Sequence, residues 1–228
     1  MRSGIESALG PVSTAAAVFG CWQVGTPQRQ HVVAEAIADA WRGRPWPGPG
    51  LRSYAVLAAD DGTTLLHFSQ VDDLDDVPAQ DLTWKQQVDA AVPGIERTGV
   101  TAGVLRRSTP AYGPAAEAAC AVLVTRIFDG PDAERANRLV DAMFESSAGT
   151  PPAKGLLSAH FYVSPDGTKV FNYALWISAD AHRQAIEKRP AELEANAQWQ
   201  RVHAYPGLLS TSFQRFRPLL RLAPTTRS

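Results

Sequence analysis

Hydrophobic residues follow two different periods along this chain, and the periods alternate in a fixed order. Residues 15–24 are mostly apolar and long enough for a strand, and Val33, Ile37 and Trp41 recur at helical spacing after Pro27. The Pro and Gly residues between 43 and 50 prevent that helix from continuing. The first part of the chain is therefore predicted to contain strands at 15–24, 51–59, 63–71 and 98–107, with helices after Pro27 and at 84–91.

The same order of periods returns in the second part of the chain. The residues Ala136, Leu139, Val140 and Met143 lie on one face of a predicted helix over 132–147. The other predicted elements are a strand at 119–128, a hairpin over 156–176, helical stretches within 178–202 and a strand at 208–216. Each part is thus β-α-β-β-α-β, the ferredoxin-like arrangement, an α+β fold with an antiparallel sheet and both helices on one face.

The two parts also repeat in sequence at a constant distance. Equivalent residues are 105 positions apart in the pairs Gly50 and Gly155, Asp61 and Asp166, and His67 and Asn172. This period is the length of a small domain rather than of a solenoid repeat. We therefore predict ferredoxin-like domains at 15–107 and 118–220, joined by a linker at 108–117 that is rich in Pro, Gly and Ala. The free faces of two such sheets can pack together, which predicts a fused, pseudo-dimeric α+β barrel.

Composition and charge narrow the class of protein. The 228 residues are 45% hydrophobic and 20% charged with a net charge of −1, and no basic run is interleaved with aromatic residues. The first thirteen residues lack the apolar core of a secretory signal, and no apolar run reaches about 18 residues. We expect a cytoplasmic protein without nucleic-acid or membrane partners. Cys21 and Cys120 begin corresponding segments, and free thiols in strands are favoured over a disulfide.

The hairpin of the second part predicts which side chains share a face. Pro165 and Gly167 favour a type I turn with a G1 bulge, which pairs Ser164 with Thr168 and His160 with Asn172. One face then carries a polar and aromatic cluster, while the opposite face packs beneath the helices. The predicted cluster consists of Ser158, His160, Tyr162, Asn172 and Trp176.

The first part lacks this cluster when it is aligned in the same way. Its equivalent hairpin pairs Ala55 with His67, and one histidine and two serines are the only groups there able to exchange protons. A cavity lined by the cluster is favoured, with a packed interface or a solvated face as alternatives. For His160, a structural histidine is an alternative to a catalytic base.

These motifs resemble those of the antibiotic biosynthesis monooxygenases, the dimeric α+β barrel oxygenases that act on aromatic polyketides. The resemblance rests on residues 155–161, on Asp166-Gly167-Thr168, and on residues 172–176 followed by 178–182. It implies that Asn172 and Trp176 line the pocket, as the corresponding asparagine and tryptophan do in anthrone-oxidising members. The first part has lost both residues. Fused members are similar to the ring-opening oxygenases of angucycline pathways, for which reduced flavin is implied, whereas other members need no cofactor.

The predicted function is a monooxygenase that oxidises an anthrone, phenol or hydroquinone intermediate of antibiotic biosynthesis. Such a substrate reduces molecular oxygen once it has been deprotonated. We assign His160 as the base, Asn172 to the oxyanion or peroxide, Tyr162 to a supporting hydrogen bond and Trp176 to a stacking wall. Further candidate substrate-binding residues are Ser158, His67, Trp46 and Phe161.

Cofactors and partners follow from the same residues. The five histidines show no metal-ligand spacing, and no Gly-rich phosphate loop follows a strand. We expect either no cofactor or reduced flavin (FADH2 or FMNH2) as a co-substrate with oxygen, and a flavin reductase as a partner in the second case. The halves could pair within one chain or across a homodimer. The alternatives are a non-catalytic module that binds a planar ligand or assembles a pathway complex, and a cofactor-free cyclase or isomerase.

Overall fold

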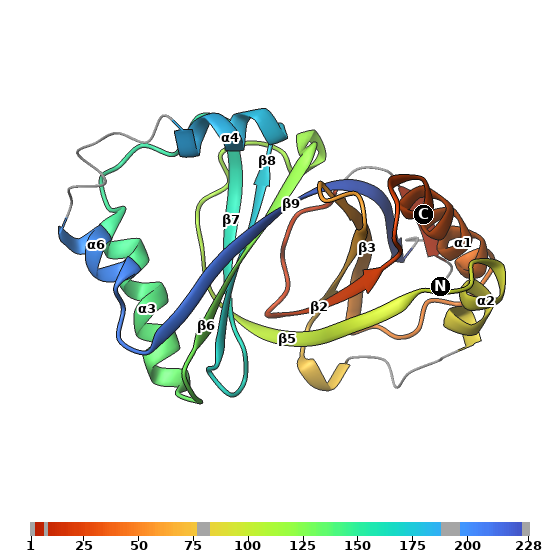
Figure 1. Cartoon of the computed structure of the whole chain (residues 1–228), viewed down its shortest axis with the longest axis horizontal. Helices are drawn as coiled ribbons and strands as arrows, with labels where there is room; N and C mark the ends of the chain where they lie inside the picture. Colours follow the sequence, from red (N-terminus) through yellow and green to blue (C-terminus); the bar gives the residue numbers. More distant parts are fainter. Residues whose placement is uncertain (1–2, 7–8, 77–82, 188–196, 225–228) are drawn as a thin grey trace. The chain divides into compact units, whose positions relative to one another are not determined.

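The computed structural model describes residues 3–6, 9–76, 83–187 and 197–224. The strands and helices predicted for this part of the chain are present, and a short N-terminal strand is added (Figure 1). Of the helical stretches predicted within 178–202, residues 188–196 lie outside the described residues. The strands are β1 (Ser3–Glu6), β2 (Ala16–Gln23), β3 (Leu51–Ala59), β4 (Thr64–Val71), β5 (Glu96–Ser108), β6 (Cys120–Phe128), β7 (Leu156–Val163), β8 (Lys169–Trp176) and β9 (Leu208–Pro224). The helices are α1 (Pro27–Trp41), α2 (Thr83–Ala91), α3 (Ala133–Ser146), α4 (Ala179–Glu187) and α6 (Ala197–His203).

The chain forms two compact units whose limits differ from those of the two sequence repeats. Unit 1 comprises residues 1–102 and 216–228, and unit 2 comprises residues 103–215. The strands β5 and β9 therefore each contribute residues to both units. Within β9, the residues after Phe216 pair with β3 and β1 of unit 1, so this strand continues well beyond its predicted end at 216.

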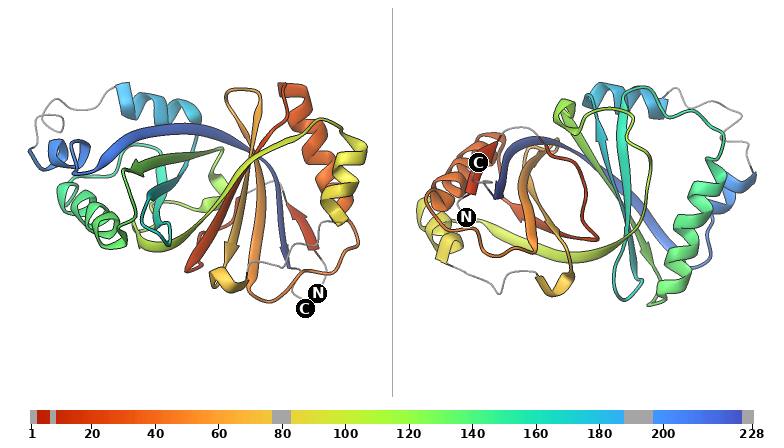
Figure 2. Two further views of the ribbon diagram at one scale, coloured as in Figure 1. Left: turned by 60° about the horizontal axis from the view of Figure 1, so that its bottom comes forward. Right: turned by 180° about the vertical axis from the view of Figure 1, so that it is seen from behind.

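The strand order confirms the α+β class with a ferredoxin-like, antiparallel arrangement. The order is β1-β9-β3-β4-β2-β5-β7-β8-β6, and β6 also pairs with β9. Apart from β1, the hydrogen-bonded order is thus cyclic, as the α+β barrel prediction requires. Figure 2 shows α1 and α2 together on one face of the unit 1 strands, and α3 and α6 together on one face of the unit 2 strands.

The helices of both units begin and pack as their sequence pattern predicts. The Thr26 side chain accepts a hydrogen bond from the Arg29 backbone N–H at the start of α1, and Asp132 caps α3 through the Arg135 N–H. In α3, the four residues predicted to share a face, including Met143, are buried against the sheet. Local caps and the 3.6-residue period therefore determine these helices.

The predicted register of the β7–β8 hairpin is wrong by one residue. His160 lies opposite Tyr173 rather than Asn172, and Asn172 lies opposite Phe161. The Ser164 backbone N–H donates to the Lys169 carbonyl oxygen, so the loop is one residue longer than predicted. The Asp166 carboxylate stabilises this longer loop by accepting from the Thr168 N–H and from the Ser164 hydroxyl.

The same shift occurs in the β3–β4 hairpin. His67 lies opposite Val56 rather than Ala55, and the Asp61 carboxylate accepts hydrogen bonds from the Thr63 and Thr64 backbone N–H groups. Each hairpin has a second register shift near its open end, between residues 51 and 53 and between residues 156 and 158. Beyond this shift the predicted pairs are found again, Leu51 with Val71 and Leu156 with Trp176. A one-residue shift moves one strand's side chains to the opposite face, which redistributes the predicted site residues.

Candidate functional site

The corrected register divides the predicted cluster between two faces of the unit 2 sheet. Asn172 and Trp176 lie with Phe161 on the face that packs against α3, here called the helix side. His160 and Tyr162 lie with Ser158 on the opposite face, where all three are buried. The prediction that one face carries all five cluster residues is therefore wrong, because it counted one residue too few in the loop.

His160 is held by two serine hydroxyl groups of its own unit. Its Nδ1 lies 2.8 Å from Ser108 Oγ and its Nε2 lies 3.0 Å from Ser158 Oγ. Burial lowers the pKa of His160 to about 4, so the imidazole is neutral at pH 7. Both ring nitrogens are already engaged, and the ring lies on the face away from Asn172. This geometry favours the structural alternative for His160.

On the helix side, two polar atoms of β8 are buried and have no hydrogen-bond partner among the described residues. These atoms are Asn172 Oδ1 and Trp176 Nε1, both on β8. Leaving a buried polar group unsatisfied costs about 1–3 kcal/mol, so native proteins keep few of them. The two residues are four positions apart along the strand, a span of about 13 Å. A ligand of fused rings that offers a hydroxyl to one and a carbonyl to the other would satisfy both atoms.

A histidine from α4 packs against the indole of Trp176. The His182 ring meets Trp176 edge to face with centroids 4.9 Å apart. Its Nδ1 accepts a hydrogen bond from Arg215 Nε at 2.9 Å. Because Nδ1 is an acceptor, the neutral ring carries its proton on Nε2 and acts there as a donor. His182 was not among the residues predicted to form the site.

An arginine on β6 is also buried on the helix side. Arg126 alternates with Val124 and Phe128 toward α3, and its side chain is only 7% exposed. Its Nη1 atom has no hydrogen-bond partner, and within the described residues it forms no ion pair. Burial lowers the pKa of Arg126 to about 10. Arg126 was not among the predicted site residues, although an arginine within an otherwise apolar strand is a signal that the sequence offers.

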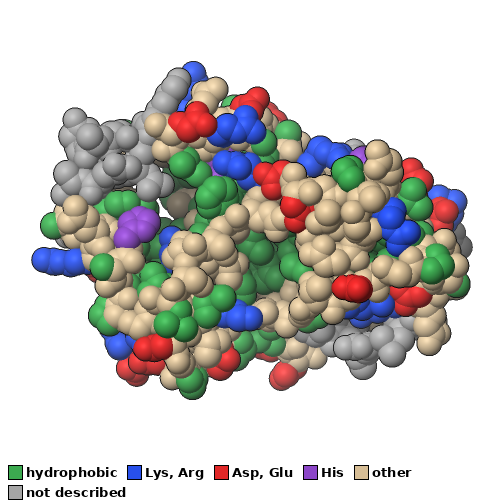
Figure 3. All heavy atoms as spheres, viewed as in Figure 1, with side chains coloured by type: hydrophobic (Ala, Val, Ile, Leu, Met, Phe, Trp, Pro, Cys, Tyr) green, Lys and Arg blue, Asp and Glu red, His purple; other side chains and the backbone are tan. Residues whose placement is uncertain are grey.

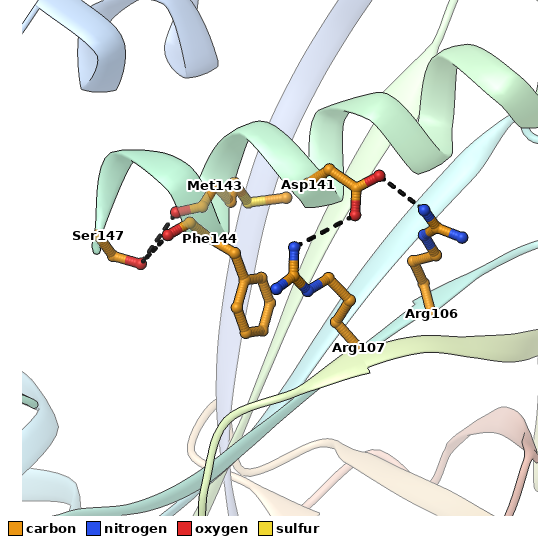
Figure 4. Close-up of polar contacts among 6 residues, drawn as sticks. All are labelled: Arg106, Arg107, Asp141, Met143, Phe144 and Ser147. Carbon is orange, nitrogen blue, oxygen red and sulfur yellow. Dashed lines mark hydrogen bonds and ion pairs between the residues drawn. The ribbon is translucent and has the colours of Figure 1, made fainter. Parts of the chain in front are cut away.

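Aromatic contacts and ion pairs hold α3 against the helix side of the unit 2 sheet. The Phe144 ring packs edge to face on Phe161 with centroids 5.2 Å apart, and the Arg107 guanidinium lies 4.2 Å from the Phe144 ring centre. The Asp141 carboxylate binds Arg106 at 2.7 Å and Arg107 at 3.4 Å (Figure 4). These contacts join α3 to β5 and place an apolar wall beside Asn172, which is opposite Phe161 on the neighbouring strand.

The helix side of unit 1 is filled by aromatic rings. His67 Nδ1 lies 2.5 Å from the Tyr54 hydroxyl, and the Trp22 ring lies 4.1 Å from the His67 ring. Trp84 stacks on Trp22 at 5.9 Å. Trp46, predicted to bind substrate, is buried and donates from Nε1 to the Leu51 carbonyl oxygen at 2.6 Å. His67 and Trp46 thus lie in a packed aromatic cluster.

Comparison of the two units shows that unit 2 lacks these rings. Trp22 pairs with Leu65 in unit 1, and Arg126 pairs with Val170 in unit 2. Because Val170 is the repeat equivalent of Leu65, 105 residues later, Arg126 occupies the position that Trp22 has in unit 1. By the same alignment Asn172 replaces His67. Cys21 aligns with Thr125, so the predicted correspondence of Cys21 with Cys120 is wrong. Both cysteines are free thiols. Figure 3 shows the surface of unit 2 hollowed between β7 and α6.

Comparisons with known proteins define the fold of the chain. A solved anthrone oxidase-like protein is 16% identical with a TM-score of 0.67, covering 96% of this chain and 95% of that one. A proposed monooxygenase from Fusobacterium nucleatum is 9% identical with a TM-score of 0.59, covering 94% and 97%. A protein described as a major regulator of staphylococcal pathogenesis is 10% identical with a TM-score of 0.51, covering 89% and 99%. No family model and no curated protein sequence shows a significant match.

These neighbours have the same α+β fold as this chain, and the similarity concerns the fold alone. The fold predicted from the resemblance is therefore confirmed. Among the described residues, no group of three or more His, Cys, Asp or Glu side chains could hold a metal ion. In the same part of the chain, none of the helices combines the length and apolar character needed to cross a membrane.

Proposed function

We propose that this protein is an oxygenase that oxidises an electron-rich aromatic compound of polyketide type, such as an anthrone, a phenol or a hydroquinone, with molecular oxygen. The observation that carries the proposal is the pair of unsatisfied polar atoms, Asn172 Oδ1 and Trp176 Nε1, beside aromatic rings on the helix side of unit 2. The fold shared with an anthrone oxidase-like protein supports the same reaction class.

The proposed roles follow from the hydrogen-bonding capacity of each group. Asn172 Oδ1 accepts a hydrogen bond from a substrate hydroxyl, and the Trp176 N–H donates to a carbonyl oxygen that gains negative charge. Donors aimed at a developing oxyanion stabilise it more strongly when they are buried than in bulk water. The Phe161 and Phe144 rings orient the planar substrate. His160 lies on the other face and is not the base, so the substrate proton passes to solvent.

For an anthrone, the chemistry balances without an additional reductant. The anthrone loses a proton from its methylene carbon, and the carbanion, stabilised as the enolate, transfers one electron to oxygen. Superoxide and the substrate radical combine at that carbon to form a C–O bond, and protonation gives a hydroperoxide. Loss of water then breaks the O–O bond and leaves a carbonyl group. Ring-opening substrates would instead consume reduced flavin supplied by a separate reductase.

The test is oxygen uptake by the purified protein with 1,8-dihydroxyanthrone in air, with and without enzymatically reduced flavin. This probe carries both a hydroxyl group for Asn172 and a carbonyl group for Trp176. Asn172→Ala and Trp176→Phe are expected to reduce kcat/KM at least about tenfold each, the effect of losing one buried hydrogen bond to a charged oxygen. The matched control is His160→Gln on the opposite face, which should retain uptake within about twofold. Equal losses in all three variants would contradict the assignment of the site to the helix side.

A planar-ligand-binding module is the second candidate function. It is favoured by the hydrogen bond that His182 Nδ1 already accepts from Arg215, which leaves this nitrogen engaged within the protein. If 1,8-dihydroxyanthrone binds but no uptake exceeds the uncatalysed rate with or without reduced flavin, the binding function replaces the oxygenase. Turnover of a bound substrate that continues in the absence of oxygen would instead indicate a cyclase or isomerase.

A further inference from the structure

Arg126 is a buried cation that the fold does not require. Unpaired charges are seldom buried because their desolvation is not compensated. In the same fold, unit 1 places the apolar indole of Trp22 at the equivalent position. The α3 residues that face this layer are apolar. Of the acidic side chains of α3, Glu134 and Asp141 pair with other arginines, and Glu145 is exposed. The protein itself therefore supplies no described counter-charge for Arg126.

The position of Arg126 directs it toward the site at Asn172. Val124 lies opposite Asn172, and Arg126 is two residues further along β6 on the same face. Such diagonal neighbours have Cα atoms about 7–8 Å apart, within reach of long side chains. The equivalent pair in unit 1, Trp22 and His67, has ring centres only 4.1 Å apart. Side chains at these two positions are thus within reach of a common ligand over the sheet.

We infer that Arg126 binds an ionised oxygen of the substrate, so that the site on the helix side of unit 2 selects aromatic compounds that carry a phenolate, an enolate or a carboxylate. The inference rests on the proposed function for the location of the pocket, and it adds the charge of the ligand. A guanidinium presents its N–H donors as a planar fork that matches two oxygen lone pairs. With Asn172 beside it, the ionised oxygen and a neighbouring hydroxyl are recognised together.

The experiment is anaerobic isothermal titration calorimetry of the full chain with three related probes. These are 1,8-dihydroxyanthraquinone, its 3-carboxylic acid and its 1,8-dimethoxy ether. Arg126→Met is expected to weaken binding of an acidic probe at least about tenfold and to leave the ether unchanged. If only the carboxylic acid is affected, the recognised group is a carboxylate; if both acidic probes are affected equally, it is the phenolate.

Stability measurements separate a ligand-binding role from a structural one. Removal of an uncompensated buried charge should raise the Tm of the ligand-free protein, so Arg126→Met is expected to be at least as stable as the wild type. Arg126→Lys retains the charge without the fork and should bind the acidic probes more weakly than the wild type. Arg138→Met, at an exposed position on α3, is the matched control and should change neither property.

Several outcomes would overturn the inference. They are equal affinity of the wild type for the acidic probes and the ether, no binding of any probe, or unchanged acid binding by Arg126→Met combined with a lower Tm. Because binding is measured without oxygen, its result is independent of turnover. Acid-selective binding without oxygen uptake would contradict only the oxygenase proposal, whereas uptake without acid selectivity would contradict only the role of Arg126.

Discussion

At the scale of single residues, the two units use equivalent positions for different purposes. His67 is bonded to Tyr54 and enclosed by indole rings, whereas its counterpart Asn172 keeps an unsatisfied oxygen. Burial is the largest cause that lowers the pKa of His67, to about 3, with Lys85 and Arg97 contributing. Unit 1 therefore packs aromatic rings at the place where unit 2 has Asn172 and Arg126.

The hydrogen bond between Tyr54 and His67 gives a prediction for stability. Tyr54→Phe leaves His67 Nδ1 without its partner in a buried layer where Nε2 already has none. We expect the free energy of unfolding to fall by about 1–3 kcal/mol, measured by urea denaturation. The control is Tyr112→Phe, since Tyr112 is 44% exposed. Similar stability of both variants would show that the short contact contributes nothing to folding.

At the scale of elements, each hairpin loop packs against the start of a helix. A Cβ atom at Gly167 would lie 2.3 Å from the Ala133 backbone nitrogen at the beginning of α3. In unit 1, a Cβ atom at Gly62 would lie 2.9 Å from Pro27 Cγ at the beginning of α1. The two Asp-Gly-Thr loops therefore have two roles, since they turn the chain and also approach the helix closely.

Replacing Gly167 separates these two roles. Gly167→Ala introduces a backbone clash at a residue with φ +70°, and we expect it to cost about 3 kcal/mol or more. Gly149→Ala is the matched control because Gly149 has φ +77° but nothing within 4 Å of the added Cβ. That variant reports backbone strain alone, about 1–2 kcal/mol. Equal Tm changes for the two variants would indicate that the close approach to α3 is not important.

At the scale of the whole molecule, His67 in unit 1 and His160 in unit 2 make stability depend on pH, because burial lowers the pKa of both. His67 and His160 have folded-state pKa values lowered to about 3 and about 4, while the unfolded chain titrates near 6.5. Below pH 6.5 the unfolded state binds more protons than the folded state, so acid favours unfolding. The contribution is complete above about pH 6.5 and is lost as the pH falls toward 4.

We therefore expect the free energy of unfolding to decrease between pH 6.5 and 5 by up to about 1.4 kcal/mol per pH unit for each histidine. The measurement is the urea midpoint at several pH values in this range. His67→Asn introduces the residue that unit 2 has at this position and should reduce the slope by about half, whatever its effect on stability at pH 7. A slope identical to that of the wild type would show that His67 is not the group responsible.

The sequence by itself determined the secondary structure and the α+β class. Helix positions follow from caps and the 3.6-residue period, which are local, and the predicted α3 face is the one that packs on the sheet. The 105-residue repeat indicated the same order of elements in both parts. The end of β9 could not be predicted from local sequence, because a proline such as Pro218 usually ends or interrupts a strand. Here β9 continues past Pro218, which lies at an irregularity in its pairing with β3, a strand distant in sequence.

Only the tertiary structure decided which residues meet in the site. Almost every residue of β3, β7 and β8 is partly or fully buried, so polar alternation does not determine the register of either hairpin. The register depends on an aspartate carboxylate that stabilises one more loop residue, which separates His160 from Asn172. The role inferred for Arg126 likewise depends on the partners it lacks, and such an absence becomes visible only when the strands and helices are packed.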